Sequence, residues 1–268
     1  MSFNGERSLQ QCSRVSDSME VVSDRLIRLT APAKLTTSLR VVGLREDGFH
    51  LIDAEMVSLD FGDTITIDPE GPDGVVFVDQ DDQIVDVGPD DLVSRAMAMV
   101  RRHGSVTVRK VIAPGAGLGG GSADAAAILH WASMTDAHEA AGLGADVAFC
   151  VFGGRARVQG IGEVLTALPF EERSFTVLTP PLMCSTPAVY RAWDELGGPE
   201  GEWGNDLEPA ALAVAPDLVR WRDELHSATG SRPRLAGSGS TWFVEGEFPG
   251  DGRIVTRTIP ARVSPPSL

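Results

Sequence analysis

The sequence predicts an α+β fold with two structural units. Segments that alternate like strands and segments with helical spacing occur in both halves of the chain. They do not follow the strict strand–helix alternation that indicates a doubly wound sheet. A polar, proline-containing segment at residues 168–174 separates the halves. We therefore expect one unit over residues 25–170 and a second over residues 171–268.

Composition narrows the class of protein. Of the 268 residues, 43% are hydrophobic and 23% charged, which is typical of a globular chain with a sizeable core. The net charge of −15 argues against nucleic acid or an anionic membrane as partner, because both require a basic surface. The cysteines (Cys12, Cys150 and Cys184) are far apart, and no apolar run approaches the ~20 residues of a membrane span. We expect a cytoplasmic protein; composition predicts no oligomeric state.

The first unit begins with strand-rich sequence. Residues 1–24 are polar and lack the hydrophobic stretch of a secretory signal, so we expect a disordered tail. Residues 25–43 carry β-branched residues in alternation and predict two strands broken near Pro32. After a turn at residues 47–48, residues 54–68 predict two further short strands.

The rest of the chain mixes both element types. In the first unit we expect strands at residues 75–79 and 106–112, helices at 91–104 and 122–133, and a short turn followed by a strand over 144–160. In the second unit we expect a strand near residue 175 and helices at 187–196 and 210–225, and then the segment at 232–246.

A glycine-rich loop carries the first chemical signal. Residues 115–121 read GAGLGGG, with five glycines, and Ser122 and an alanine-rich helix follow. Glycine lets a ligand approach the backbone, and the first N–H groups of a helix lack internal partners and face the positive end of its dipole. This arrangement predicts a phosphate site, in which Ser122 can cap the helix or contact a phosphate or its metal ion.

Other phosphate motifs fit less well. No Gly-Lys-Ser/Thr closes the loop, so it is not a Walker A loop. The glycines at 115, 117 and 120 match the dinucleotide pattern, but that pattern belongs in a first strand–helix unit and this loop lies in the middle of the chain.

Five segments, in this order, resemble the GHMP-type small-molecule kinases. They are APAKLTTSLRVVGLREDGFHLIDAEMVSLDFGDTITI (31–67), PGAGLGGGSADAAA (114–127), GADVAFCVFGGRARVQGIGEVL (144–165), NDLEPAAL (205–212) and GSGST (237–241). The resemblance implies a GHMP architecture, with an S5-like N-terminal ATP-binding domain and a ferredoxin-like C-terminal domain. The PAK…DGFH and GADVAFC segments are most similar to the branch that phosphorylates a cytidine diphosphate-linked polyol in non-mevalonate isoprenoid biosynthesis.

The resemblance also implies site residues. Lys34 and Asp146 match the catalytic pair, and Thr36, Phe49, His50 and Thr186 match substrate-binding positions. ATP is implied at Pro114, Gly115, Ala116, Gly117, Leu118, Gly119, Gly120, Gly121, Ser122 and Ala123, and at a third motif of Gly237, Ser238, Gly239 and Ser240. Mg²⁺ is expected with ATP because it shields phosphate charge, and the sequence identifies no set of metal ligands.

Independent chemistry supports the catalytic pair. Phosphoryl transfer depends on positioning and on charge neutralisation, and a carboxylate beside the acceptor hydroxyl can orient it and take its proton. Asp146 enters an apolar run and Lys34 lies among small apolar residues, where an unpaired charge is costly.

The sequence also departs from the family pattern. Thr36 replaces an asparagine, Phe49 a tyrosine, and the segment before Gly144 is short, which predicts an abbreviated helix there. Two alternatives therefore stay open. One is a related kinase whose acceptor is mevalonate, homoserine or a sugar, and the other is a nucleotide-binding protein with weak or lost catalysis.

Overall fold

The computed structural model describes residues 20–21 and 25–261. Nearly all of the expected tail, at residues 1–19 and 22–24, lies outside the described residues. The two described residues of this segment, Glu20–Val21, form β1, which pairs antiparallel with the start of β2 (Ile27–Leu44).

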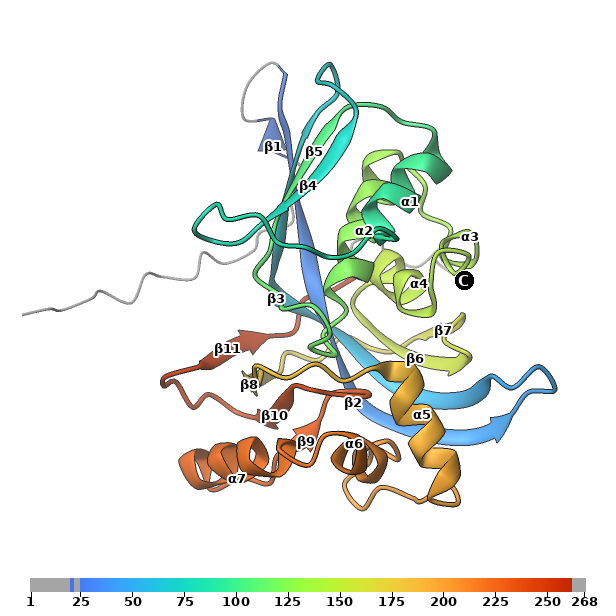
Figure 1. The fold of residues 1–268 in the computed structure, drawn as a ribbon, viewed down its shortest axis with the longest axis vertical. Coiled ribbons are helices and arrows are strands. Elements are labelled where there is room, and N and C mark those ends of the chain that lie inside the picture. Colours follow the sequence, from blue (N-terminus) through green and yellow to red (C-terminus); the bar gives the residue numbers. More distant parts are fainter. Residues whose placement is uncertain (1–19, 22–24, 262–268) are drawn as a thin grey trace, which may run out of the picture.

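The first part of the chain forms a sheet covered on one side by helices (Figure 1). In chain order its further elements are β3 (His50–Asp68), β4 (Gly74–Val78), α1 (Leu92–Val100), β5 (Ser105–Arg109), α2 (Gly120–Trp131), α3 (Ala137–Ala140), α4 (Ala145–Phe152), β6 (Arg155–Gly160) and β7 (Val164–Ala167). The sheet order is β1-β2-β3-β5-β4, and β6 joins the free part of β3 and carries β7.

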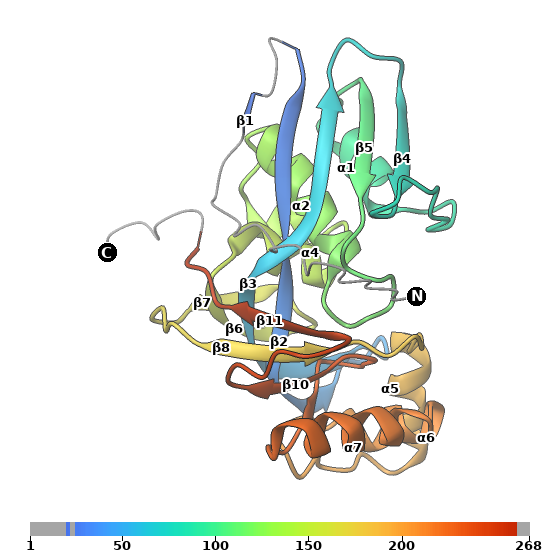
Figure 2. The same cartoon turned by 90° about the vertical axis from the view of Figure 1, so that its left-hand side faces the viewer.

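The second part forms a smaller antiparallel sheet. Its elements are β8 (Ser174–Leu178), α5 (Thr186–Glu195), α6 (Glu208–Val214), α7 (Leu218–Thr229), β9 (Arg234–Leu235), β10 (Trp242–Glu245) and β11 (Arg253–Arg257). The sheet order β11-β8-β10-β9 is the order of a ferredoxin-like unit, but a turn at residues 246–252 replaces the second crossover helix of that unit. In Figure 2 the helices α6 and α7 lie below this sheet, and α5 lies at its right-hand end.

Two long strands replace four predicted short ones. The prediction of a break near Pro32 was wrong, because β2 runs continuously past it with only a register irregularity between Pro32 and Lys34. Gly62 lies opposite Pro32 on β3, where a Cβ atom would lie only 2.1 Å from the carbonyl oxygen of Ala31. The bare backbone of Gly62 therefore lets the strands pass closely where proline cannot donate a ladder hydrogen bond.

Two further predictions, of a turn after Gly144 and of one helix over residues 210–225, were wrong. The turn predicted after Gly144 is the helix α4, which places Asp146 in its first turn. The single helix predicted over 210–225 is two helices, α6 and α7, separated at Ala215–Pro216, because proline removes a helical hydrogen bond and disfavours helical backbone in the residue before it. The short helix expected before Gly144 is α3, four residues long.

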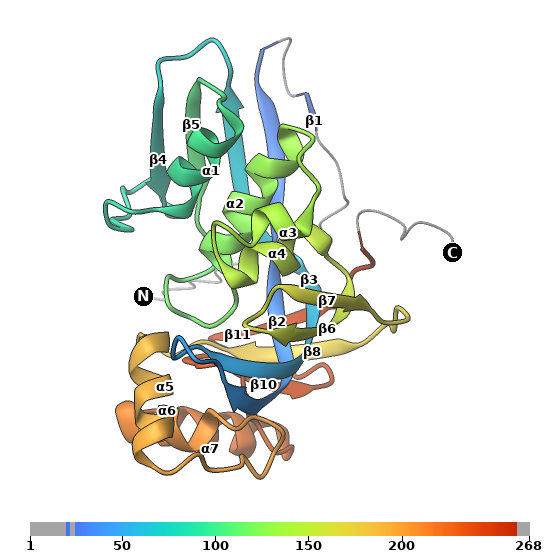
Figure 3. The ribbon, with the colours of Figure 1, turned by 90° about the vertical axis from the view of Figure 1, so that its right-hand side faces the viewer.

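The main core lies between the larger sheet and its helices. Figure 3 shows α1 to α4 in front of that sheet. Buried residues of β2, β3 and β5, such as Leu29, Ile65 and Val108, pack against the alanine-rich face of α2. Seven consecutive residues of α2, from Ala123 to Leu129, are buried, so small side chains let the helix lie close to the sheet. This packing fixes the start of α2, where the glycine loop ends.

The two sheets meet along β2 and β3. The connection at residues 168–173 leads from β7 to β8, and the chain returns at its end to the first sheet through the hydrogen bond from Ile259 N to Ser58 O, 3.0 Å. In the described residues no helix is both long and apolar enough to cross a membrane.

Candidate functional site

The glycine loop presents backbone amides at the start of α2. The helix begins at Gly120, and its N-cap, Gly119, has a left-handed φ of 69° that disfavours other residues. Among the described residues, no backbone carbonyl accepts a hydrogen bond from the amides of residues 117–122. Ser122 does not cap the helix, and its hydroxyl remains available to a ligand. The loop therefore has the free donors that a phosphate group requires.

Backbone contacts hold this loop from both sides. Lys34 N donates to Leu118 O at 3.0 Å, and Thr241 N donates to Ala116 O at 3.1 Å. A Cβ atom on Gly117, whose φ is 80°, would lie 2.6 Å from the carbonyl oxygens of Ala236 and Gly239. The third predicted motif is thus packed backbone to backbone against the phosphate loop.

Lys34 and Asp146 form an ion pair. Lys34 Nζ, on β2, lies 3.1 Å from Asp146 Oδ2, in the first turn of α4, and 3.2 Å from Thr36 Oγ1. The lysine side chain is 6% exposed and the aspartate side chain 39%. The nearly buried Lys34 side chain and the positive end of α4 both attract the Asp146 side chain. One carboxylate oxygen is thereby fixed while the group stays open to a ligand.

Two cavities meet at Asp146. Each has a volume of about 350 Å³. One follows the glycine loop and is closed by apolar residues such as Phe77, Leu92 and Ile112. The other lies between Lys34, Thr36, Tyr190 and the third motif. Both cavities are lined by Gly117, Ser122, Asp146 and Thr186. A nucleotide in the first cavity and an acceptor in the second would face each other across these four residues. We therefore call the first the nucleotide-side cavity and the second the acceptor-side cavity.

The predicted phosphate-loop residues divide between cavity wall and core. Those lining the nucleotide-side cavity are Pro114, Gly115, Ala116, Gly117, Gly119, Gly120, Gly121 and Ser122. Leu118 and Ala123 are each 2% exposed and pack in the core. Of the third motif, Gly237 and Ser238 line the acceptor-side cavity, while neither cavity includes Gly239 or Ser240.

The predicted acceptor residues are only partly brought together. Thr36 and Thr186 line the acceptor-side cavity, and Thr186 Oγ1 lies 2.8 Å from Ser238 Oγ. His50 lies one layer behind, stacked on Tyr190 with ring centroids 4.7 Å apart and with Nε2 2.8 Å from Asp194 Oδ1. Phe49 is 54% exposed and packs under Arg45 instead of lining the cavity.

Sequence reasoning missed Tyr190, the single tyrosine of the chain. It lies one helical turn after Thr186 on α5, and this i, i+4 spacing is the signal that could have found it. Its ring lines the acceptor-side cavity. Burial and the nearby Asp146 carboxylate raise the pKa of Tyr190 to about 12, so the phenol is neutral.

A buried charge cluster beneath the glycine loop was also missed. Lys110 Nζ lies 2.5 Å from Asp63 Oδ2 and 2.6 Å from Asp124 Oδ2. Asp63 also accepts from the amides of Val111 and Ile112, whereas Asp124 Oδ1 has no hydrogen-bond partner in the described part of the chain. Burial and the neighbouring Asp63 outweigh Lys110 and raise the pKa of Asp124 to about 7. Asp124 is therefore the member of the cluster that takes up a proton.

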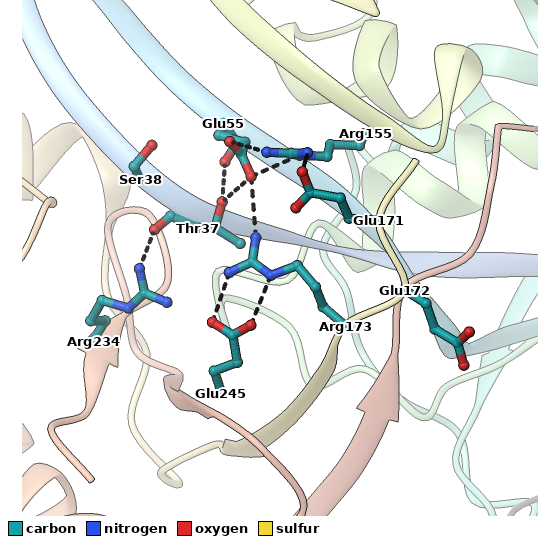
Figure 4. A pocket seen from close by; sticks show the side chains of 9 residues that line it. All are labelled: Thr37, Ser38, Glu55, Arg155, Glu171, Glu172, Arg173, Arg234 and Glu245. Atoms are coloured by element: carbon teal, nitrogen blue, oxygen red, sulfur yellow. Dashed lines mark hydrogen bonds and ion pairs between the residues drawn. The ribbon is translucent and has the colours of Figure 1, made fainter. Parts of the chain in front are cut away.

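A larger groove, of about 610 Å³, lies on the opposite face of β2 (Figure 4). Thr37 lines it and Thr36 lines the acceptor-side cavity, as expected for neighbours on one strand. Figure 4 shows Arg173 between Glu55 Oε1 at 3.3 Å and Glu245 Oε2 at 3.0 Å, which joins the two sheets. Because its charges are largely paired with one another, this groove offers less to a ligand than the two smaller cavities.

Comparisons with known proteins place the chain in a family. No family model matches it. The 4-diphosphocytidyl-2-C-methyl-D-erythritol kinase of Paracoccus denitrificans is 36% identical over 81% of this chain and 85% of that protein. The enzyme of the same name from Ruegeria pomeroyi is 34% identical over 84% of this chain and 90% of that protein.

Comparison with solved structures gives the same family and fold. A crystal structure of 4-(cytidine 5'-diphospho)-2C-methyl-D-erythritol kinase matches 86% of this chain and 99% of its own, with 29% identity and a TM-score of 0.68. Methanococcus jannaschii mevalonate kinase matches 90% of this chain and 100% of its own, with a TM-score of 0.56 at 12% identity, and therefore supports the fold alone. The predicted α+β GHMP architecture is confirmed. The chain belongs to the family of 4-diphosphocytidyl-2-C-methyl-D-erythritol kinases.

Proposed function

We propose that this protein transfers the γ-phosphoryl group of ATP to the 2-hydroxyl of 4-diphosphocytidyl-2-C-methyl-D-erythritol. Family membership supports the reaction, and one structural observation carries it: the two cavities meet at Asp146, whose carboxylate is paired with Lys34. A kinase needs this arrangement, because donor and acceptor must be held in line with little water between them.

The geometry suggests a role for each element of the junction. The free amides of residues 117–122 would bind the β- and γ-phosphates, and the apolar end of the same cavity would hold the base. Asp146 would orient the acceptor hydroxyl and accept its proton. The hydroxyl oxygen then bonds to the γ-phosphorus as the bond to the β–γ bridging oxygen breaks, and ADP leaves. Lys34 would offset the charge that gathers on the transferring group.

Mg²⁺ would accompany ATP and neutralise phosphate charge. The described residues contain no group of three or more His, Cys, Asp or Glu side chains placed to hold a metal ion. The Ser122 hydroxyl, which lines both cavities and does not cap α2, fits the role of a protein ligand to an ion held mainly by phosphate oxygens.

On the acceptor side, we propose that Thr36 and Thr186 contact the polyol. Their hydroxyls lie in the cavity beside Lys34 and Ser238. We assign the cytosine end to the aromatic group of His50 and Tyr190, since a base can stack on such rings. Phe49 would join this group only if the strand tip that carries it closes over the ligand.

Three further expectations remain part of the proposal. The net charge of −15 supports a small-molecule substrate over nucleic acid. The scattered cysteines support a cytoplasmic location. The division of strands into two sheets, with β7 ending at Ala167 and β8 beginning at Ser174, supports domains at residues 25–170 and 171–268.

A coupled assay of ADP release tests the function. The purified protein is given ATP, Mg²⁺ and, in turn, the cytidylyl substrate, mevalonate, homoserine and a panel of sugars. We expect turnover with the cytidylyl substrate alone. Turnover restricted to another acceptor would replace the proposed substrate, and nucleotide binding without turnover on any acceptor would exclude the kinase reaction.

A further inference from the structure

The buried side chain of Asn205 bonds to the loop around residue 236. Parts of this loop line the acceptor-side cavity, whereas Asn205 itself does not. The residue is 3% exposed and lies in the connection before α6. Its Nδ2 donates to Leu235 O at 2.8 Å and to Gly237 O at 2.7 Å, and its Oδ1 accepts from Leu207 N at 3.0 Å. Both amide protons are therefore committed to the carbonyls on either side of residue 236.

The segment held in this way is the wall of the phosphate loop. Directly after Leu235, the backbone of residues 236–241 packs against Gly117, and Thr241 N donates to Ala116 O at 3.1 Å. Gly237 and Ser238 line the acceptor-side cavity, and Ser238 bonds to Thr186. The 235–241 segment therefore contacts the Asn205 side chain through Leu235 O and Gly237 O, and contacts the glycine loop through Thr241 N.

We propose that Asn205 is a positioning residue for phosphoryl transfer, which sets the 236–241 wall and through it the phosphate loop. The inference rests on the proposed kinase function for its catalytic consequence, but not for its structural one. Asn205 lines neither cavity, so it would act through the wall and not by touching a reactant. Its contribution is to keep the wall in one conformation, because the two hydrogen bonds hold the carbonyl groups of Leu235 and Gly237 at the start of a glycine-containing segment.

The next residue provides a matched control. Asp206 is equally buried, at 3% exposed, but its carboxylate bonds to Arg40 Nη1 at 2.5 Å, Val41 N at 2.9 Å and Gly201 N at 2.9 Å. Arg40 and Val41 tie the connection to the later part of β2, and Gly201 lies in the connection itself, so none of these partners belongs to the 236–241 wall. Losing them should weaken the attachment of the second sheet and leave the wall in place.

Substitution by aspartate isolates the two donors. Asn205→Asp keeps the oxygen that accepts from Leu207 N, but it replaces Nδ2 with an oxygen facing two carbonyl oxygens. An ionised carboxylate cannot donate and a protonated carboxyl donates only one hydrogen bond, so the wall loses at least one of its two bonds while the side-chain volume stays nearly the same. Asn205→Ala removes all three bonds and serves as the second variant.

The experiment compares wild type, Asn205→Asp, Asn205→Ala and Asp206→Ala. Four quantities are measured at a temperature where all four proteins are folded: kcat, KM for each substrate, affinity for ADP by calorimetry, and amide hydrogen exchange of residues 236–241 by mass spectrometry. We expect both Asn205 variants to lose at least tenfold in kcat and to exchange the 236–241 amides at least tenfold faster. Asp206→Ala should keep kcat and this exchange within threefold, even where its thermal midpoint falls.

The opposite outcomes would overturn the inference. Wild-type kcat and wild-type exchange in a folded Asn205→Asp variant would show that the two bonds position nothing. Equal losses in Asp206→Ala would show a general effect of loosening the second sheet. Failure of the proposed function looks different: wild type would transfer no phosphoryl group to any acceptor, and the exchange of residues 236–241 and the ADP affinity would still decide the role of Asn205.

Discussion

Lys34 Nζ lies 3.1 Å from Asp146 Oδ2 at the junction of the two cavities. The partners come from the long strand β2 and from the first turn of α4, and the α2 helix packs against both elements. The backbone amide of Lys34 also donates to Leu118 O. Lys34 therefore takes part both in the ion pair and in holding the glycine loop. The ion pair and the free amides of the glycine loop are therefore held by the same strand.

Removing the Asp146 carboxylate should stop the reaction without emptying the nucleotide site. We expect Asp146→Ala to lower kcat by about 10²–10⁴-fold, because general-base assistance and orientation of the acceptor are lost together. ADP affinity, measured by calorimetry, should stay within a few-fold. Asp136→Ala is the control: this aspartate caps α3 through His138 N, so its loss should cost about 1 kcal/mol of stability and no activity. Full turnover in Asp146→Ala would refute the assignment.

Two glycines with similar backbone conformations allow the effect of substitution on stability to be distinguished from its effect on ATP binding. Gly117 has φ 80° and no room for a Cβ atom, whereas Gly230, after α7, has φ 67° and nothing within 4 Å of that position. Each Gly→Ala change should cost about 1–2 kcal/mol of unfolding free energy from the left-handed backbone. Only Gly117→Ala should also weaken ATP binding, by tenfold or more, because it pushes against residues 236 and 239. Denaturation and calorimetry measure the two effects, and equal ATP affinity in both variants would contradict the loop assignment.

Tyr190 should act on the acceptor and not on ATP. We expect Tyr190→Leu to raise KM for the cytidylyl substrate by about 5–150-fold, since base–aromatic stacking contributes about 1–3 kcal/mol. KM for ATP should not change. Tyr190→Phe keeps the ring, and its KM should stay within threefold of wild type. If the leucine variant alters KM for ATP instead, the ring belongs to the nucleotide side.

The buried cluster beneath the phosphate loop predicts a pH dependence of stability. The pKa of Asp124 is about 7 in the folded protein against an ordinary value of 3.8, because of burial and Asp63. The folded state therefore holds this proton between pH 4 and 7 and the unfolded state releases it. The stabilisation is complete below pH 4 and is lost as the pH rises through 7.

Asp124→Asn removes that titration. We expect the variant to gain about 2 kcal/mol relative to wild type as the pH rises from 4 to 8, following 1.4 kcal/mol per pKa unit reduced for relaxation of the buried group. Urea denaturation at several pH values, with Asp136→Asn as an exposed control, measures the difference. A constant difference across this range would mean that Asp124 is ionised throughout.

Local chemistry in the sequence predicts the phosphate loop. Five glycines directly before an alanine-rich helix indicate an anion site, because glycine lets a ligand approach the backbone and a helix start has free amides. Both properties depend only on residues that are adjacent in the sequence. The same local reasoning failed at Pro32, where the opposing Gly62 on another strand allows β2 to continue. It failed again at Gly144, where the short apolar run that follows fits a strand or a helix equally well by periodicity.

The sequence by itself determined the α+β class, the glycine loop and, through family motifs, the pairing of Lys34 with Asp146 as candidates. Only the tertiary structure decided that Tyr190 enters the acceptor side, that Phe49 stays outside it, and that Asn205 holds the wall of the phosphate loop. The physical reason is the sequence separation of the residues that interact. A turn or helix start depends on adjacent residues, whereas a buried side chain acquires its partners from strands and loops far along the chain, and packing of the whole fold selects them.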